Sequence, residues 1–528
     1  MAIAKRKPLS FNTTMRNPDR IAGFLNILKK YENKILTNKV INNICCDVIM
    51  KKIYTPNIIN RVPEWKAIND SEFDFTKDQA EQIMEASPQQ HKEAGFDAGW
   101  PSRFDTWYKL IMEFGLCYYE MNKPIEISDL GHSLIDAYNL DPIDNNMIEN
   151  VFLNAMAKFQ TSTPFRKNLN QNVPLMLLLR VLKMLKDDKT ENGAGISRRE
   201  IAFFICWPNN DAKALYKFIK NFRKIYGYNY SDETIYETCL ALFLDENHRT
   251  IDTLRDYIKM SKLVRETPDE YIRKMRITGV ISLRGNGRFL DLNLLELKKI
   301  NYLLNNYGTP VEINNKKEFY NYLKTKDDNL FVKEFEKPEN LDLKQKALFK
   351  FANLYNEEKL ARELELTYKG TCTDDLLKFI DAPVRLEFLT SIALVKYFRD
   401  IKVLPHYSTD DEGIPRFTAG GGKADIDCEG RNVKGIVEVT LMSGASQQTE
   451  HEVTSVEDHL TDIEGQTEKF TMALFIAPIL QRRALKYLNY LNDKYHNQNN
   501  NQGGIIPMLI SEMIPKFKNA SQFRNLAQ

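Results

Sequence analysis

The last third of the chain alternates short apolar runs with amphipathic segments, a pattern typical of a mixed α/β domain. A helix is predicted from Ala382 to Phe398, with a short strand near Val403. Polar and apolar residues alternate from Lys423 to Cys428, residues 429–432 form a turn, and an apolar run extends from Ile436 to Leu441, which together predict a β-hairpin. Further along we predict a helix over 447–464, a buried strand over 470–476, a helix over 480–491 and a strand over 505–510.

The N-terminal half is predicted to be mainly helical, interrupted by two hairpins. A helix over 101–114 is followed by strands at 116–119 and 125–127 and by a second helix, the outline of a winged helix. The same succession of a helix and two strands recurs at 271–292, where Gly285-Asn286-Gly287 supplies the positive φ values of a tight turn. Between them, apolar segments at 173–185 and 196–204 fit a helix-turn-helix. The alternative for the first unit, at 101–135, is an ordinary helix–hairpin packing unit.

Basic residues are concentrated around these three units, as contact with phosphates requires. We predict binding of double-stranded DNA through Arg103, Lys109, Arg198, Arg199, Arg273, Lys274, Arg276, Arg284 and Arg288. The basic and aromatic run from Lys213 to Lys224 is predicted instead as a helix with an aromatic core face and a solvated basic face.

A chain of 528 residues is too long for a single hydrophobic core. We predict a multidomain α+β protein with a helical, winged-helix-like recognition region over residues 1–300, in units of about 1–165 and 166–300. A helical linker over 301–380 leads to an α/β domain with a mixed central sheet over 381–528.

The composition excludes several classes of protein. The net charge is only +2, so a DNA-binding surface must come from segregation of charge. Seven cysteines without a CxxC pair indicate buried thiols in a reducing compartment and no zinc site. There is no signal peptide and no apolar run long enough to span a bilayer, so a cytoplasmic protein without a membrane partner is expected. A phosphate-binding Gly-x-x-x-x-Gly-Lys loop is absent, and no ATP requirement is predicted.

Two acids interrupt the predicted hairpin of the C-terminal domain. Asp425 lies near the start of the first strand, and Glu438 is flanked by Val437 and Val439 in the second. Burying a carboxylate is costly unless its charge is compensated, and a metal ion compensates it. Glu387 on the preceding helix and an acid on the following helix are positioned to join them. The alternative is a surface hairpin with solvated acids.

These residues carry a resemblance. Asp425, the Glu438-Val439-Thr440 triplet, the Ser-Gly-Ala-Ser-Gln segment at 443–447 and an acidic helix resemble the catalytic core of the AlwI family of type IIS restriction endonucleases. The resemblance extends upstream through Val384–Thr390. It implies a variant of the PD-(D/E)XK nuclease fold in which Glu387, Asp425, Glu438 and Glu452 are catalytic.

The same resemblance implies that Asp425, Glu438 and Glu387 hold one or two Mg²⁺ ions. The common motif has lysine where this chain has Thr440, so charge stabilisation must come from a second metal or another residue. The Glu-Val-Thr variant is itself characteristic of the family, together with a glutamate from the following helix. Glu452 is the nearest match and Glu450 the alternative. His451 and His459 are expected at the surface or supporting the ligands, not as catalytic bases.

The expected activity is that of a type IIS restriction endonuclease that binds a short asymmetric site and hydrolyses DNA at a fixed distance outside it. Cutting both strands then requires a second subunit, a transient homodimer or sequential nicking. The alternatives are a strand-specific nicking endonuclease of the same family, a sequence-specific DNA-binding regulator with a nuclease-like structural domain, and a repair nuclease without sequence specificity.

Overall fold

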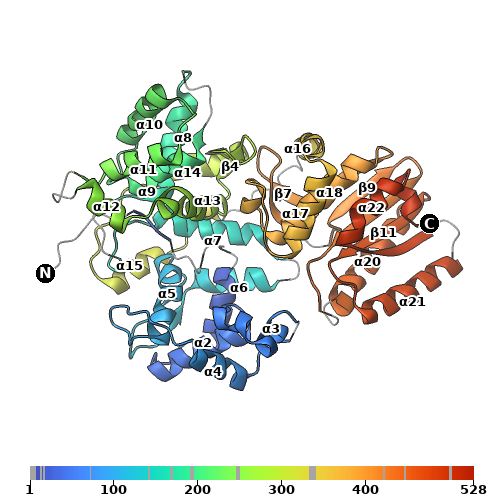
Figure 1. The fold of residues 1–528 in the computed structure, drawn as a ribbon, viewed down its shortest axis with the longest axis horizontal. Coiled ribbons are helices and arrows are strands. Elements are labelled where there is room, and N and C mark those ends of the chain that lie inside the picture. Colours follow the sequence, from blue (N-terminus) through green and yellow to red (C-terminus); the bar gives the residue numbers. More distant parts are fainter. Residues whose placement is uncertain are drawn as a thin grey trace. The chain divides into compact units, whose positions relative to one another are not determined.

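The chain forms two compact units, comprising Met1–Leu140 with Asp144–Lys333 and Asp141–Ile143 with Glu334–Gln528 (Figure 1). The computed structural model describes residues 8–527 except 12–14, 16–17, 19, 72, 141–142, 167–169, 191–194, 245–249, 332–340, 420–421, 445–447 and 499–501. No helix among the described residues is long and apolar enough to cross a membrane.

The first part of the N-terminal unit is a helical assembly with one small hairpin. The hairpin pairs β1 (Cys117–Tyr118) with β2 (Glu126–Ile127), between helices α5 (Trp100–Glu113) and α6 (Asp129–Asn139), as predicted. The remaining helices of this part are α1 (Arg20–Lys29), α2 (Asn38–Met50), α3 (Pro63–Asn69), α4 (Lys77–Ala86) and α7 (Asn145–Lys158).

In the second part of this unit, two segments that are far apart in the sequence pair in one sheet. Strand β3 (Ile196–Ser197) pairs with β5 (Phe289–Leu292), which also pairs with β4 (Ile281–Arg284). The predicted helix-turn-helix and the second predicted hairpin are therefore one three-stranded arrangement. Its helices are α8 (Pro174–Asp187), α9 (Ile201–Cys206), α10 (Ala212–Tyr226), α11 (Asp232–Ala241), α12 (Ile251–Tyr257) and α13 (Thr267–Arg276).

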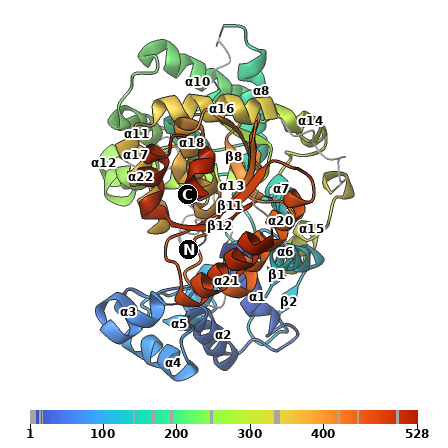
Figure 2. The same cartoon turned by 90° about the vertical axis from the view of Figure 1, so that its right-hand side faces the viewer.

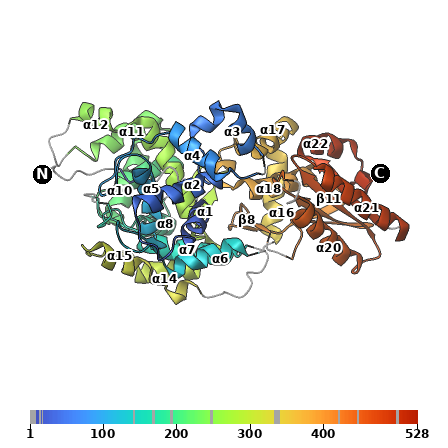
Figure 3. The same ribbon diagram turned by 90° about the horizontal axis from the view of Figure 1, so that it is seen from below.

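The segment 301–380 is divided between the two units. Helices α14 (Leu297–Asn306) and α15 (Lys316–Leu323) pack on α8 and α5 of the N-terminal unit. Helices α16 (Leu341–Leu354) and α17 (Glu357–Tyr368) pack on α18 of the C-terminal unit, as Figure 3 also shows. Each of these helices buries an apolar face against its own unit. The described part of this segment therefore does not form a third compact unit.

The C-terminal unit is built on a mixed five-stranded sheet in the order β12-β11-β10-β9-β6. Strands β6 (Ile401–Pro405), β9 (Ile426–Gly430) and β10 (Val433–Val439) run antiparallel in succession, whereas β11 (Phe470–Ala477) and β12 (Gln502–Leu509) continue parallel to β10. The helices are α18 (Ala382–Tyr397), α20 (Val453–Glu464), α21 (Arg482–Gln498) and α22 (Ile510–Asn519). The predicted hairpin and buried strand are confirmed. A separate hairpin of β7 (Tyr407–Thr409) and β8 (Pro415–Ala419) was not predicted.

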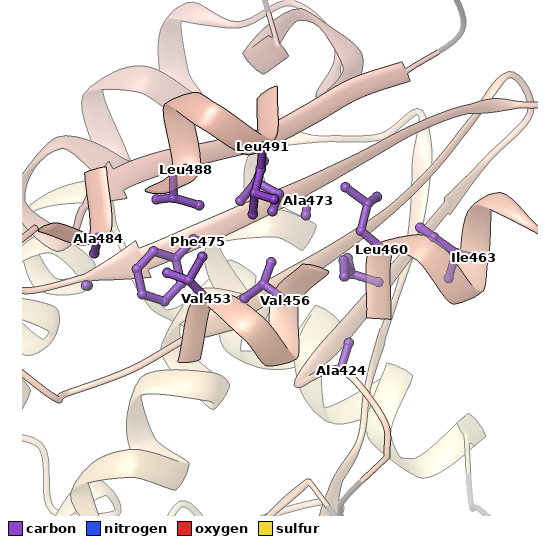
Figure 4. Packing of buried hydrophobic residues seen from close by; sticks show 13 residues of the cluster. Ala424, Val453, Val456, Leu460, Ile463, Ala473, Phe475, Ala484, Leu488 and Leu491 are labelled. Atoms are coloured by element: carbon purple, nitrogen blue, oxygen red, sulfur yellow. The ribbon is translucent and has the colours of Figure 1, made fainter. Parts of the chain in front are cut away.

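Helices cover both faces of this sheet (Figure 2). On one face, Ala473 and Phe475 of β11 pack with residues of α20 and α21, including Val456 and Leu488, in a continuous apolar cluster (Figure 4). On the other, Phe398 packs on the rings of Phe517 and Phe523. Because successive residues of a strand point to opposite faces, residues 436 and 438 of β10 face α20.

Candidate active site

The β9–β10 hairpin brings Asp425 and Glu438 together. Ile426 pairs with Val437, so continuing this antiparallel register places Asp425 opposite Glu438. The Val439 amide donates a hydrogen bond of 2.8 Å to Asp425 Oδ2. The carboxyl groups of Asp425 and Glu438 also hydrogen-bond to each other. The predicted acid pair is therefore formed by the strand register alone.

Glu387 and Glu452 approach the pair from two helices. Glu387 of α18 is only 2% exposed and accepts a 3.3 Å hydrogen bond from the Ala419 amide at the end of β8. Glu452 ends a π-helical turn, Gln448–Glu452, that leads into α20. The charges of Glu387 and Glu452 both act on Glu438. The side chains of Glu450, which is the alternative to Glu452, and of His451 lie outside the described part of the structure.

Burial and mutual repulsion perturb the ionisation of these acids. Burial raises the pKa of Glu438 to about 8, and the charges of Glu452 and Glu387 act in the same direction. Burial, and then the charge of Glu438, raises the pKa of Asp425 well above its usual range. Burial and the charge of Asp425 do the same to the pKa of Glu387. Without a cation, these acids therefore tend to keep protons, because burial leaves a negative charge here poorly screened by water.

Histidine 459 supports this cluster. It lies on α20, and its Nδ1 is 2.7 Å from Glu438 Oε1, with both side chains largely buried. A histidine held in this way fixes the orientation of a ligating carboxylate. The expectation that His459 lies beside the ligands is thus consistent with its position in the structure.

The donor set fits a hard divalent cation by charge and by atom type. Carboxylate oxygens are the ligands that Mg²⁺ prefers, and a cation would compensate the burial and the mutual repulsion that raise the pKa values of these acids. Among the described residues, no group of three or more His, Cys, Asp or Glu side chains is already close enough to hold a metal ion. Binding therefore requires that the carboxylates turn towards the ion.

The position two residues after Glu438 carries no positive charge. Thr440 is buried, its amide donates to the Ile476 carbonyl at 3.0 Å, and its hydroxyl accepts from the Met442 amide. A buried lysine elsewhere affects the cluster instead. Lys344 of α16 donates to the Pro405 carbonyl at 3.0 Å, and its charge lowers the pKa of Glu387. Sequence analysis missed Lys344 because the signal is a contact between distant segments.

Most of the basic residues predicted to contact DNA are engaged within the protein. Arg103 contacts His91 and Tyr54, and Lys109 pairs with Asp105 and Glu93. Two further ion pairs join Arg198 to Asp269 and Arg284 to Asp291. Side chains held in this way have less freedom to meet a phosphate.

Helix α13 is largely buried and does not present a free face for a DNA groove. Lys274 has no exposed surface and donates to the Met15 carbonyl, and Arg276 is buried. Arg273 is half-buried. The expectation that Lys274 and Arg276 lie on a DNA-facing surface is wrong, because both side chains are buried within the N-terminal unit. Arg199, half exposed and paired with Asp232, and the exposed Arg288 of the β4–β5 turn remain accessible.

Comparison with known proteins places these observations in a family. A model of the AlwI restriction endonuclease family matches residues 112–369 and 349–515. Curated protein sequences contain no match to this chain.

Similar solved structures include three restriction enzymes. The small subunit of the heterodimeric restriction endonuclease R.BspD6I has 20% identity and a TM-score of 0.25, covering 31% of this chain and 80% of its own. The BpuJ1 endonuclease binding domain, in complex with modified DNA, has 12% identity and a TM-score of 0.37, covering 61% and 97%. The restriction endonuclease FokI has 12% identity and a TM-score of 0.26, covering 98% and 95%. These TM-scores are too low to establish a common fold.

Proposed function

We propose that this chain, which belongs to the AlwI restriction endonuclease family and is a site-specific deoxyribonuclease, is a type IIS enzyme. It binds a short asymmetric site and hydrolyses both strands at a fixed distance outside it, with Mg²⁺ as cofactor and without ATP or zinc. The observation that carries the proposal is the cluster of Glu387, Asp425, Glu438 and Glu452 around one hairpin.

Each acid has a separate task in this proposal. Asp425 and Glu438 are the principal metal ligands, since they face each other across two adjacent strands. Glu387 and Glu452, from opposite helices, orient water or a second ion. A divalent ion held by these acids would supply Lewis-acid stabilisation of the charge that develops on the phosphate and would lower the pKa of an attacking water. His459 holds the Glu438 carboxylate in place.

The order of elements supports a PD-(D/E)XK-type nuclease domain. Helix α18, the antiparallel strands β6, β9 and β10, helix α20 and the parallel strand β11 follow one another along the chain. The acids lie at the second and third strands of this series. We assign recognition to the N-terminal unit, with the β4–β5 turn and its exposed Arg288 as a contact to phosphate.

One cluster of acids hydrolyses one strand at a time. Cleavage of both strands therefore needs a transient homodimer, a second subunit or two successive binding events. A strand-specific nicking enzyme is the alternative within the same family, and it differs in the products and not in the residues of the site.

Mapping the ends of a fully sequenced plasmid tests the proposal. The expected result is a set of discrete ends at one offset from a shared short sequence, formed with Mg²⁺ and abolished by EDTA and by Asp425→Asn. Single-strand breaks at that offset select the nicking enzyme. Specific retention of DNA without cleavage would select a regulator, and scattered ends a repair nuclease.

A further inference from the structure

A pocket of about 610 Å³ lies between the start of α20 and the first turns of α21. Its walls consist of Thr449, Thr454, Arg483, Lys486, Tyr487 and Tyr490. Two of these six residues are cationic and none is acidic. Within a chain whose net charge is only +2, this lining favours a negatively charged occupant.

The apolar core fixes the helix that carries the cations. Ala484, Leu488 and Leu491 of α21 point into the apolar cluster that this helix forms with α20 and β11 (Figure 4). Arg483, Lys486 and Tyr490 lie off this apolar face and are exposed, whereas Tyr487 is partly buried and packs against the cluster. The cations thus stand on a firmly packed helix, which suits a site that positions a ligand.

Two aromatic rings complete the wall. Tyr487 and Tyr490 are stacked, with ring centroids 6.5 Å apart and an interplanar angle of 14°. The Tyr487 hydroxyl donates to Glu457 on α20 at 3.1 Å, which holds its ring between the helices. Tyr490 is 64% exposed. An exposed aromatic surface beside cations is the combination that binds a nucleic-acid strand.

The pocket shares a structural element with the acid cluster. Thr449 and Thr454 lie three residues before and two residues after Glu452, within the same helical segment. One helical turn rises about 5.4 Å. At about 1.5 Å of rise per residue, Thr449 and Thr454 lie within about 5 Å of Glu452 along the helix axis. That rise is comparable to one or two nucleotides of a duplex, at about 3.4 Å each.

We propose that this pocket binds the sugar–phosphate backbone of the DNA strand being cut, next to the scissile phosphate. Arg483 and Lys486 contact phosphate oxygens, and Tyr490 packs on the sugar. These are positioning residues that hold the strand in line with the acids and also supply positive charge near a site where Thr440 stands in place of lysine. The inference rests on the nuclease function proposed above.

The salt dependence of binding tests this inference. In the cleavage-deficient Glu438→Gln background, affinity for a duplex carrying the mapped site is measured against salt concentration. Each lost phosphate contact makes the slope of log K against log[salt] less negative by about 0.9. We expect Arg483→Gln with Lys486→Gln to change the slope by about 2, and the same changes in the active enzyme to raise KM roughly 10- to 100-fold. The exposed Lys402 of β6 provides the matched control, since Lys402→Gln should leave both unchanged.

The outcomes separate the two proposals. If the wild-type enzyme does not cleave, the nuclease function itself fails. If it cleaves, but the double variant, with a wild-type melting temperature, keeps its slope and KM, the pocket does not bind DNA. A changed sedimentation mass with an unchanged slope would show instead that the pocket contacts a second copy. If the double variant does not fold, Lys486→Gln alone decides, with a slope change of about 1 expected.

Discussion

Glu438 lies on a strand that is otherwise apolar around it, and burial raises its pKa to about 8 from an ordinary 4.5. The metal-free folded protein therefore keeps a proton that the unfolded chain has already lost at neutral pH. Stability then falls as pH rises from about 4.5 to about 8, by at most about 1.4 kcal/mol per pH unit for each such proton. A divalent cation replaces this proton, so its affinity should rise over the same range.

We predict a matching pH dependence of thermal stability. Without metal, the melting temperature should fall between pH 5 and pH 8, and Mg²⁺ should restore more of it at pH 8 than at pH 5. Glu438→Gln, which cannot ionise, should flatten the metal-free profile and weaken the effect of Mg²⁺. Scanning calorimetry at several pH values provides the measurement. Equal stabilisation by Mg²⁺ at both pH values would contradict the assignment of these acids as ligands.

The contact between His459 and Glu438 makes a second prediction. His459→Ala leaves the carboxylate free to rotate, so the cleavage rate should fall about 10- to 100-fold and the Mg²⁺ concentration for half-maximal rate should rise. DNA affinity should stay unchanged, which distinguishes this role from a structural one. His132→Ala, which removes a histidine paired with Glu32 in the N-terminal unit, is the control. A loss of DNA affinity in His459→Ala would argue against the role.

At the scale of single residues, the sequence predicted the positions of the acids in the fold better than the surroundings of the basic residues. The positions of Asp425 and Glu438 follow from one local hairpin, whose alternation of polar and apolar residues is visible in the sequence. The partners of a basic side chain do not follow from any such local pattern. Lys109 pairs with Asp105, which is four residues away on the same helix face and can be recognised from the sequence. The other partner of Lys109, Glu93, belongs to a preceding loop and cannot. Without these partners, a cluster of arginines and lysines looks more available to DNA than it is.

Among the elements, those with long apolar or strictly alternating runs were predicted well. Helix α18, the β9–β10 hairpin and strand β11 lie where the pattern placed them. The β7–β8 hairpin was missed because its strands are short and its pairing is irregular. The pairing of β3 with β5 joins residues about 90 positions apart, and no local pattern indicates such a contact.

Strand β10 offers a test at the level of the element. A Cβ atom on Gly435 would lie 2.6 Å from the Phe523 ring, so the strand needs glycine there to pack against the C-terminal turn. Gly435→Ala should lower the free energy of unfolding by about 1–3 kcal/mol. Urea denaturation measures this, and Gly465→Ala is the matched control because its nearest contact is 3.7 Å away. A stability equal to that of Gly465→Ala would show that Phe523 moves aside freely.

For the whole molecule, the division into two units predicts separable activities. Residues 1–331 should retain specific binding to the mapped site without cleavage, and residues 341–528 should lack that specificity. Footprinting of each fragment provides the measurement, and full-length Asp425→Asn is the reference for binding without cleavage. A specific footprint from residues 341–528 would place recognition in the wrong unit.

The predicted linker shows what composition leaves undetermined at this scale. The composition of residues 301–380 is charged and typical of helices, which fits both a spacer and the margins of two domains. The structure assigns them by where their apolar faces pack, with α14 and α15 on one unit and α16 and α17 on the other. The sequence shows that each of these helices has an apolar face, but it does not show which unit that face packs against.

The order of the acids along the chain has a consequence for synthesis. A ribosome releases Glu387, Asp425, Glu438 and Glu452 only after the whole N-terminal unit, and domains generally fold as they emerge. The hairpin pair can form from residues released together, but Glu438 meets His459 and Glu452 only once α20 follows. If the N-terminal unit recognises DNA as proposed, a stalled or prematurely terminated polypeptide binds DNA but cannot cleave it. Incomplete chains therefore do not damage the DNA of the cell that makes them.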